Sequence, residues 1–597
     1  MGVKGLTQFV ESRRDLSSRR RFNPVDLDWR TRRSPPRDLL VVDGNSLLRD
    51  FYTPDLDWTF GGEWLALRDA VHDFVRRFRR VGFDLVVIFD GAVEKSKRRT
   101  WTERRRNEQS KIQRIFDVII TGGRRPDNRL CLLPSGLSTY VRAALTSCEC
   151  TVLNSFGEAD REIAQYCIDH DAYGVLGQDS DYFIYPLTRH FGTKNLSVRD
   201  REVVMVEHNL GAITKALGLE LSRLPVFAAL CGNDVLDVSI LKSFHQRVTN
   251  SSHYSGSDAV RAVAEFVARF PSSITNEEIG RMVLNRKYMD RFKAAVAMYD
   301  LRRDKDCAAE RSPVSSISAD VLALAKERHY RAENSHLVYP LMRTAEIDIG
   351  STLEDPLNRC GLPDSGLLLR LIRRRVYGLL LGVRSRRSSA SSEELIIGEN
   401  AAHEWCVYRG NDLREADVVK ADPLPSSVAS LDELWLGSHS EAKRLKAFLY
   451  CMGWEQQMRD LELRDCHPHH LILCTVLHFF IDERVLYDYE IDAFLAQAVD
   501  LKYCRVSDLR RMDHFSRLDA RAVHLGALFM RAVYVATFAY NSCGMVCDDS
   551  VTSPWHFFDG VLFHCKYVEA KRGTPLAHLC RCSRDAFYLK DFVTGRN

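Results

Sequence analysis

The sequence lacks a long apolar run: no uncharged stretch reaches 18 residues, the length that a membrane-spanning helix requires. The closest, residues 532–547, contains Asn541 and Gly544. The first six residues, MGVKGL, lack the apolar core of a signal peptide. Leu6 also stands where an N-myristoylation motif has Ser or Thr. We therefore expect no membrane span and an intracellular chain whose 17 cysteines are reduced.

The chain has little net charge, because 84 basic residues nearly balance 80 acidic ones to give +4. This total does not indicate a nucleic-acid partner by itself, so the distribution of charge must decide. Residues 13–37 and 97–125 are both basic stretches. The default interpretation of such a stretch is a solvated helix face. The second stretch, however, closely follows one of the acidic motifs described below, which favours phosphate binding; it includes Arg98, Arg99, Arg105, Arg106 and Lys111.

The apolar pattern predicts an α/β fold followed by a mainly α-helical region. Short apolar runs at 39–42, 85–89, 151–153 and 174–176 alternate with helical patterns at 64–80, 138–145 and 159–168, which is typical of a mostly parallel sheet flanked by helices. We predict one domain over 1–240, in parts 1–125 and 126–240, and a helical extension over 241–310. Residues 311–434 are expected to be linker and mixed structure, with a disorder-like Ser/Arg-rich loop at 384–392. Residues 435–597 are expected to be helical.

Seven acidic residues lie just beyond, or close to, apolar runs that we interpret as strands: Asp43, Asp90, Glu158, Asp160, Asp179, Asp181 and Asp234. In a parallel α/β sheet the carboxyl ends of the strands open onto one crevice, so these side chains should meet. Each motif also has an ordinary structural explanation that requires no shared site. Asp-Gly pairs are common in turns, and Glu158 and Asp160 suit a helix start. Seven such acids, in five motifs of one chain, are better explained by a shared site.

Carboxylates that meet repel one another unless cations neutralise them. Oxygen-only ligands favour Mg²⁺, with Mn²⁺ as a substitute, and paired metals are a device for phosphodiester hydrolysis. We assign Asp90, Glu158, Asp160 and Asp179 to one or both of two Mg²⁺ ions. Asp181 and Asp234 are assigned to the second ion, and Asp43 acts through water or orients the others.

The motifs MGVKGL, VVDG, IFDG, FGEAD, GQDSDYF and CGND, in this order and spacing, resemble the flap endonuclease and XPG-type nuclease superfamily, which has a PIN-like fold. The resemblance covers about residues 1–240. It implies that Lys97 and Arg104 contact the scissile phosphate, that Asp43 belongs to the catalytic group, and that Gly2 lies at the nucleic acid. The motif RRRVYGLLLG at 373–382 is similar to the asteroid family in particular.

This resemblance implies a metal-dependent, structure-selective DNA endonuclease that acts on single-stranded flaps or overhangs in DNA repair, and hence a nuclear protein. Two departures qualify it. The sequence after Asp234, VLDVSILKSFHQRV, lacks the Gly-rich turn with which flap endonucleases bind duplex DNA, and no sliding-clamp binding box is present. The alternative is a catalytically silent nuclease-fold scaffold that binds nucleic acid or protein.

A zinc site is a weaker interpretation of the C-terminal His and Cys residues. The run Cys466-His467-Pro468-His469-His470, with His564, Cys565, His578, Cys580 and Cys582, offers suitable ligands, but no CxxC pair with finger spacing occurs. Buried cysteines and surface histidines are the simpler interpretation.

Overall fold

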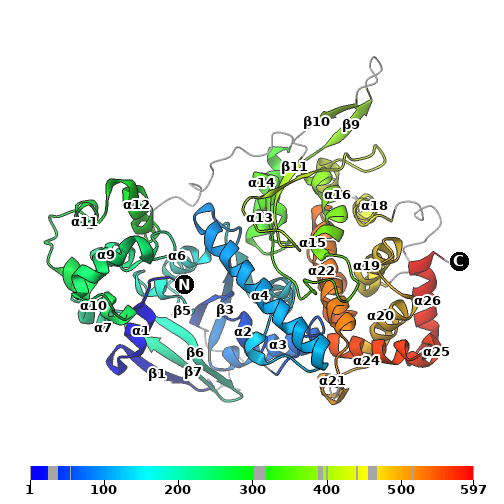
Figure 1. Cartoon of the computed structure of the whole chain (residues 1–597), viewed down its shortest axis with the longest axis horizontal. Coiled ribbons are helices and arrows are strands. Elements are labelled where there is room, and N and C mark those ends of the chain that lie inside the picture. The colour runs from blue at the N-terminus through cyan, green and yellow to red at the C-terminus, as the bar shows by residue number, and fades with distance from the viewer. Residues whose placement is uncertain are drawn as a thin grey trace, which may run out of the picture. The chain divides into compact units, whose positions relative to one another are not determined.

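The structure, a computed structural model, describes residues 2–24, 38–53, 55–301, 317–387, 394–397, 401–438, 441–454, 467–512, 515 and 517–595 (Figure 1). It forms two compact units. The first comprises residues 1–47, 73–101 and 148–309, and the second comprises residues 48–72, 102–147 and 310–597. All seven predicted acids and Lys97 belong to the first unit, whereas Arg104 belongs to the second.

The first unit is built on a seven-stranded sheet in the order β1-β7-β6-β5-β2-β3-β4. The strands span Ser17–Phe22 (β1), Asp38–Asp43 (β2), Phe83–Phe89 (β3), Thr151–Asn154 (β4), Gly174–Leu176 (β5), His190–Arg199 (β6) and Glu202–His208 (β7). The pairs from β6 through β4 are parallel, and β1, β7 and β6 pair antiparallel. The predicted mostly parallel α/β sheet is confirmed.

The four apolar runs predicted as strands are β2 to β5, because residues buried on both faces give continuous Val, Ile and Leu runs. Strands β1, β6 and β7 were not predicted. β1 has the sequence SSRRRF, whose basic residues hide it from a search for apolar runs. Its Arg20 pairs with Glu207, and its Arg21 Nη1 lies 3.4 Å from Glu202 Oε1 on β7. The rest of the basic stretch, residues 25–37, lies outside the described residues.

The first unit also contains helices, and those that follow β7 continue the unit to about residue 300. Helix α6 packs against β2, β3 and β5. The helices are α1 (Leu6–Glu11), α6 (Ala159–Asp169), α7 (Leu210–Leu217), α8 (Leu224–Cys231), α9 (Val238–Thr249), α10 (Gly256–Ala268), α11 (Asn276–Val283) and α12 (Met289–Ala297). Ser255 and Thr275 begin α10 and α11 with capping boxes, each satisfying backbone N–H groups that the first turn leaves unpaired. The segment VLDVSILKSFHQRV, which follows Asp234, forms most of α9, and α10 comes next along the chain.

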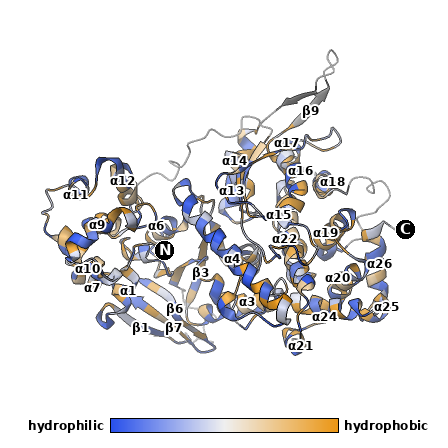
Figure 2. Ribbon diagram, viewed as in Figure 1, coloured by the Kyte–Doolittle hydropathy of each residue, from blue (hydrophilic) through white to orange (hydrophobic). Residues whose placement is uncertain are grey.

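The chain passes between the units along helices α3 (Trp64–Arg80) and α4 (Arg98–Gly122). The predicted bounds of α3 match the observed ones. Hydrophilic and hydrophobic residues mix along α4 in Figure 2, as they do on an amphipathic helix. Ile112, Ile115, Phe116 and Ile119 form its buried side.

The second unit is mainly helical, and the prediction of a mainly α-helical C-terminal region is confirmed. Besides α2 (Leu48–Phe51) and α5 (Leu137–Ser147), it contains α13 (Ala319–Tyr330), α14 (Val338–Thr344), α15 (Ser365–Leu368), α16 (Arg370–Leu380), α17 (Leu431–Trp435), α18 (Glu441–Met452), α19 (Leu471–Asp482), α20 (Asp488–Leu501), α21 (Val506–Met512), α22 (Ala520–Ser542), α23 (Asp549–Thr552), α24 (Gly560–Lys571), α25 (Leu576–Leu579) and α26 (Ser583–Thr594).

Helix α22 is the centre of the second unit. It is long and apolar enough to cross a membrane by length and composition, and its most apolar window is wholly buried inside the unit. It packs against α16, α19 and α24. Helix α22 approaches the backbone of residues 60–61 closely at Gly526. A Cβ at this position would lie 2.5 Å from the Phe60 carbonyl oxygen, so the approach needs glycine. These contacts are those of a core helix.

Two small sheets complete the second unit. β8 (Glu346–Ile349), β11 (Ala401–Cys406) and β12 (Asp417–Lys420) form one, and β9 (Arg384–Arg387) pairs antiparallel with β10 (Glu394–Ile397). The prediction of a disorder-like loop over 384–392 is therefore wrong for 384–387. Backbone pairing with β10 makes these residues a strand despite their charge, while 388–392 lie outside the described residues.

Candidate metal and phosphodiester site

Five of the seven acids follow strands or begin the helix after one, as the sequence predicts. Asp43 ends the central strand β2, and Asp90 directly follows β3. Asp160 lies in the first turn of α6, after β4. Asp179 follows β5 and begins a short 3-10 helix, Ser180–Phe183, in which Asp181 is the second residue.

Two acids follow the pattern less closely. Glu158 is the N-cap residue of α6, although its side chain makes no capping hydrogen bond. Asp234 follows α8 rather than a strand, so the strand interpretation there is wrong. The run LPVFAALC has Pro225 at the helix start, and all of its residues except Pro225 are buried, so it forms a short core helix. The turn after α8 still brings Asp234 to the site.

Three carboxylates converge most closely. One oxygen from each of Asp160, Asp179 and Asp181 lies within 4.8 Å of the other two, close enough to hold a single metal ion. This is the one such group of His, Cys, Asp and Glu residues found across the described part of the chain. Cys466, the first residue of the considered zinc run, lies outside the described residues.

Asp181 is the most deeply placed of the three. Its side chain is fully buried, and its Oδ1 accepts a hydrogen bond of 2.7 Å from the Tyr299 hydroxyl. Its Oδ2 is also buried and has no hydrogen-bond partner. An unsatisfied buried carboxylate oxygen is costly, and a cation bound by Asp160, Asp179 and Asp181 would satisfy it. The all-oxygen donor set fits a hard divalent ion such as Mg²⁺ or Mn²⁺.

The electrostatics of the cluster are those of crowded, desolvated acids. Burial is the main cause that raises the pKa of Asp160, Asp179 and Asp181, and neighbouring carboxylates raise it further. Burial, and then Asp90, raise the pKa of Asp43 to about 6. A bound cation would favour the charged carboxylates and so would oppose these raised pKa values.

Lys97 neutralises part of this cluster in the structure. Its Nζ lies 2.8 Å from Glu158 Oε2 and 3.2 Å from Asp234 Oδ2. Burial lowers the pKa of Lys97, but attraction to Glu158 and Asp234 outweighs it and raises that pKa, so the ammonium stays charged. Burial raises the pKa of Glu158 while Lys97 opposes the rise. The lysine thus lies among the acids and pairs directly with two of them.

Asp43 and Asp90 are held by local hydrogen bonds at the edge of the cluster. Asp43 Oδ1 accepts from the backbone N–H groups of Asn45 and Ser46, each at 3.1 Å. Asp90 accepts from the Asn45 side-chain amide, and its Oδ1 accepts from the Ala159 N–H at 2.9 Å. These contacts tie the turn after β2 to the start of α6, which suits a role in orienting the cluster.

Gly2 lies against the convergent acids. Its φ is +71°, and a Cβ would lie 2.0 Å from Asp179 Oδ1 and 2.6 Å from Ser180 Oγ. Only a residue without a side chain fits this position, because any Cβ would overlap the carboxylate. The structure thus places Gly2 at the acids, while its contact with nucleic acid stays a prediction.

The remaining predicted nucleic-acid residues lie on α4. The Arg98 guanidinium lies 5.5 Å from the Trp101 ring, and Arg106 Nη2 donates to the Asp412 carbonyl oxygen at 2.6 Å. Arg105 Nη1 is 2.9 Å from Glu108 Oε2, and Lys111 Nζ donates to the Cys131 carbonyl oxygen at 2.6 Å. Arg99 and Arg104 lie on the same helix. Their roles toward DNA stay predictions.

Sequence reasoning missed Asn45, Ser46 and Tyr299. The first two directly follow Asp43, and an Asp followed by Asn and Ser is a recognisable signal for a side-chain turn. Tyr299 is 118 residues from Asp181 and lies just beyond α12, so no local pattern in the sequence connects the two.

Residues 149–234 match the family model of the XPG I-region. The matched residues contain five of the seven acids, from Glu158 to Asp234, including the three that converge. Residues 217–303, which span α8 to α12, match a second family model, the FAM120A-like domain. The two matched segments overlap at residues 217–234.

Two named proteins are similar to this chain over most of its length. The chain is 29% identical to a Bos taurus protein named constitutive coactivator of peroxisome proliferator-activated receptor gamma, over 96% of this chain and 92% of that protein. A Mus musculus protein of the same name is 26% identical, over 98% and 90%. These names do not mention the asteroid family, so the finer resemblance to it stays a prediction.

Two solved structures with bound DNA are also similar to this chain. Human GEN1 in complex with Holliday junction DNA is 13% identical, over 77% of this chain and 98% of that one, with a TM-score of 0.30. The catalytic core of Rad2 in complex with DNA substrate is 15% identical, over 52% and 98%, with a TM-score of 0.29.

Proposed function

We propose that the first unit is a divalent-metal-dependent phosphodiesterase that cleaves DNA, acting as a structure-selective endonuclease on single-stranded flaps or overhangs. The observation that carries this proposal is the convergence of Asp160, Asp179 and Asp181, one of whose buried oxygens is unsatisfied. The match to the XPG I-region over residues 149–234 supports it independently. A role in DNA repair and a nuclear location follow from the proposed substrate.

The acidic residues of the site would have different roles toward the ions. Asp160, Asp179 and Asp181 would hold a hard divalent ion, and Asp90, Glu158 and Asp234 would hold or orient a second one. Such ions supply positive charge beside a phosphodiester and favour its hydrolysis. Asp43 would orient the neighbouring turn through its hydrogen bonds to Asn45 and Ser46.

Lys97 would exchange partners during this reaction. It is charged, and in the structure it balances Glu158 and Asp234. With those acids holding ions, the Lys97 ammonium would instead bind a phosphate oxygen and stabilise the charge that develops there. Arg104 is proposed to add a second phosphate contact, as the resemblance implies.

The second candidate is a non-enzymatic scaffold that binds nucleic acid or protein. The similar proteins named as coactivators favour this alternative, since a coactivator name describes an interaction rather than a hydrolysis. Retention of all seven acids favours the enzyme, because a chain under no demand for metal binding would gain stability by replacing crowded buried carboxylates.

Cleavage of branched DNA distinguishes the two candidates. We expect the full chain with Mg²⁺ to cleave flap, overhang or splayed substrates, and the Asp179→Asn/Asp181→Asn variant to lose at least about a hundredfold in single-turnover rate. Both substitutions keep the side-chain volume, so circular dichroism should be unchanged. Equal cleavage by the variant contradicts the active-site assignment. Absent cleavage by the wild type, with DNA or protein binding intact, favours the scaffold.

A further inference from the structure

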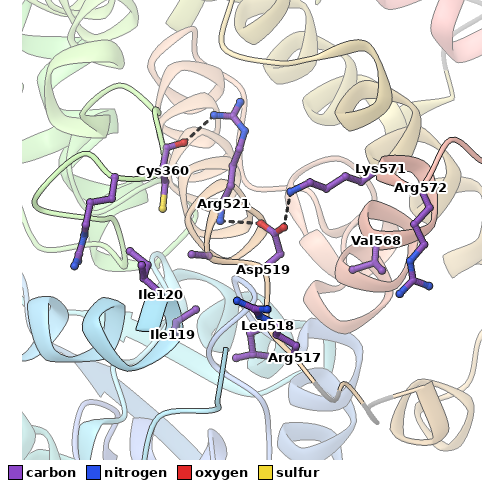
Figure 3. Close-up of a pocket in the computed structure, with 12 residues that line it drawn as sticks. Ile119, Ile120, Cys360, Arg517, Leu518, Asp519, Arg521, Val568, Lys571 and Arg572 are labelled. Atoms are coloured by element: carbon purple, nitrogen blue, oxygen red, sulfur yellow. Dashed lines mark hydrogen bonds and ion pairs between the residues drawn. The ribbon is translucent and has the colours of Figure 1, made fainter. Parts of the chain in front are cut away.

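The second unit contains a pocket of about 570 Å³ that the proposed nuclease chemistry does not use. Its wall comes from the C-terminal part of α4, the segment before α22, the first residues of α22, and α24 (Figure 3). Apolar side chains, among them Ile119, Ile120 and Val568, form part of the lining. This volume is typical of a site for a small molecule.

Five basic side chains and one acidic side chain also line the pocket. Three of the basic ones are paired with carboxylates: Arg359 Nη2 with Asp355 at 2.9 Å, Arg521 Nε with Glu490 at 2.7 Å, and Lys571 Nζ with Asp519 at 2.6 Å. These three therefore contribute little uncompensated charge.

Arg517 and Arg572 differ from the other three. Across the described part of the chain, neither guanidinium forms an ion pair or a side-chain hydrogen bond. Both residues are exposed at the pocket, and Figure 3 shows them on separate segments, Arg517 before α22 and Arg572 at the end of α24. The pocket thus has two available guanidinium groups and an apolar lining.

The backbone of both arginines is fixed. The Leu518 N–H donates to the Gly123 carbonyl oxygen at 2.8 Å, which ties the segment before α22 to the end of α4. The stem of Arg517 lies on Gly123, where a Cβ would come within 2.2 Å of Arg517 Cγ. Arg572 is the C-cap residue of α24, and its N–H reaches the carbonyl oxygens of Val568 and Glu569. A fixed backbone reduces the entropy that ligand binding must overcome.

We propose that this pocket binds a phosphate monoester with an apolar or flat body, such as a nucleoside phosphate. Arg517 and Arg572 contact the phosphate, because guanidinium groups match phosphate oxygens in charge and geometry. Two guanidiniums suit a dianion better than a monoanionic carboxylate. Asp519, the one acidic lining residue, caps α22 by accepting from the Arg521 and Ala522 N–H groups and pairs with Lys571, so its negative charge is already compensated. The apolar lining then covers the body of the ligand.

Calorimetric titration of the full chain with AMP and ADP tests this proposal, with adenosine and inorganic phosphate as partial ligands. We expect AMP or ADP to bind, adenosine to bind at least tenfold more weakly, and inorganic phosphate to bind weakly. Arg517→Gln and Arg572→Gln should each weaken AMP or ADP binding about tenfold. The double substitution should abolish it.

The matched control is Arg510→Gln, an exposed arginine on α21 that does not line the pocket. It should leave nucleotide affinity unchanged, and thermal unfolding of all variants should match the wild type. The proposal is overturned if neither nucleotide binds, if adenosine binds as tightly as AMP, or if the double variant binds like the wild type. It is likewise overturned if a 5′-phosphorylated single-stranded oligonucleotide competes for these arginines while free nucleotides do not. None of these results depends on DNA cleavage, so this proposal and the proposed function can fail separately.

Discussion

At the scale of single residues, the site is defined by how its carboxylates are compensated. Glu158 and Asp234 share Lys97, Asp43 accepts from its own turn, and Asp181 accepts from Tyr299. The other buried oxygen of Asp181 has no hydrogen-bond partner. The acids are thus unevenly satisfied, and the deficit lies where Asp160, Asp179 and Asp181 converge.

Replacing Lys97 should make the first unit more dependent on cations. In Lys97→Met, Glu158 and Asp234 lose their shared positive charge, so the melting temperature in EDTA should fall. A cation no longer competes with the ammonium, so the Mn²⁺ concentration that gives half of the full stabilisation should fall about tenfold. This corresponds to roughly 1.4 kcal/mol of binding free energy. Thermal unfolding against Mn²⁺ concentration measures both effects.

Lys194→Met is the matched control, because Lys194 pairs with Glu11 on the surface of the same unit at 2.7 Å. Exposed ion pairs contribute about 0–1 kcal/mol, so this variant should behave as the wild type does. An unchanged Mn²⁺ midpoint in Lys97→Met would show that the ammonium does not compete with cations.

At the scale of elements, helix α16 shows that a sequence motif can be structural rather than catalytic. Arg373 is buried, and its Nε lies 2.8 Å from Glu404 Oε1 on β11. The Tyr377 hydroxyl donates to the same carboxylate, and Arg370 pairs with it at 2.9 Å. A Cβ on Gly378 would lie 1.9 Å from the Asp422 oxygen, so the helix needs glycine at that approach. The motif at 373–382 therefore joins α16 to the small sheet.

Arg373→Met should lower the free energy of unfolding by about 3–5 kcal/mol, because it removes the buried positive charge that pairs with the Glu404 carboxylate. Urea unfolding monitored by circular dichroism measures this change. The neighbouring Arg374→Met is the control, since Arg374 is partly exposed and pairs with Asp422, and its cost should stay below about 1 kcal/mol. Equal costs would contradict a central role for the buried pair.

The sequence predicts elements well where burial dictates the pattern and poorly where charge masks it. Strands β2 to β5 and helices α3, α5 and α6 follow apolar runs or apolar periodicity, and these were predicted nearly to their ends. β1 and β9 are rich in arginine, and backbone pairing with β7 and β10 makes them strands. The helix before Asp234 is fully apolar, so periodicity alone cannot distinguish it from a strand.

For the candidate site, the acidic residues were predicted from the sequence but most of their hydrogen-bond partners were not. The seven acids were identified because they lie beside apolar runs, whereas Lys97 was implied by the resemblance to the nuclease superfamily. The partners that hold the acids come from elsewhere: Tyr299 reaches Asp181 only after α8 to α12 have packed. Tertiary contacts of this kind have no local signal. The pairing of Lys97 with Glu158 and Asp234 is likewise a result of packing.

At the scale of the whole molecule, stability is expected to depend on pH through buried acids in both units. Asp559 in the second unit is fully buried and begins α24. Its Oδ1 accepts from the Val561 and Leu562 N–H groups, and its Oδ2 has no hydrogen-bond partner. Burial, and then the nearby Glu63, raise the pKa of Asp559 to about 8.

Because the folded pKa of Asp559 lies above the unfolded value, its stabilising contribution is complete below the unfolded pKa and is lost as pH rises toward 8. Asp559→Asn removes this titration and retains the capping oxygen. We expect the wild type to lose about 2–4 kcal/mol more than the variant between pH 5 and pH 8. Urea unfolding at the two pH values measures the difference, and parallel losses would contradict a raised pKa.

Binding of Mn²⁺, measured by electron paramagnetic resonance of the free ion, tests the central claim most directly. If Asp160, Asp179 and Asp181 form a site for a hard divalent cation, the wild type should bind at least one Mn²⁺ per chain at pH 7.5, and excess Mg²⁺ should displace it. Asp179→Asn/Asp181→Asn should abolish this binding while the chain stays folded. A wild-type chain that binds no Mn²⁺, or a double variant that binds it equally well, would contradict the account.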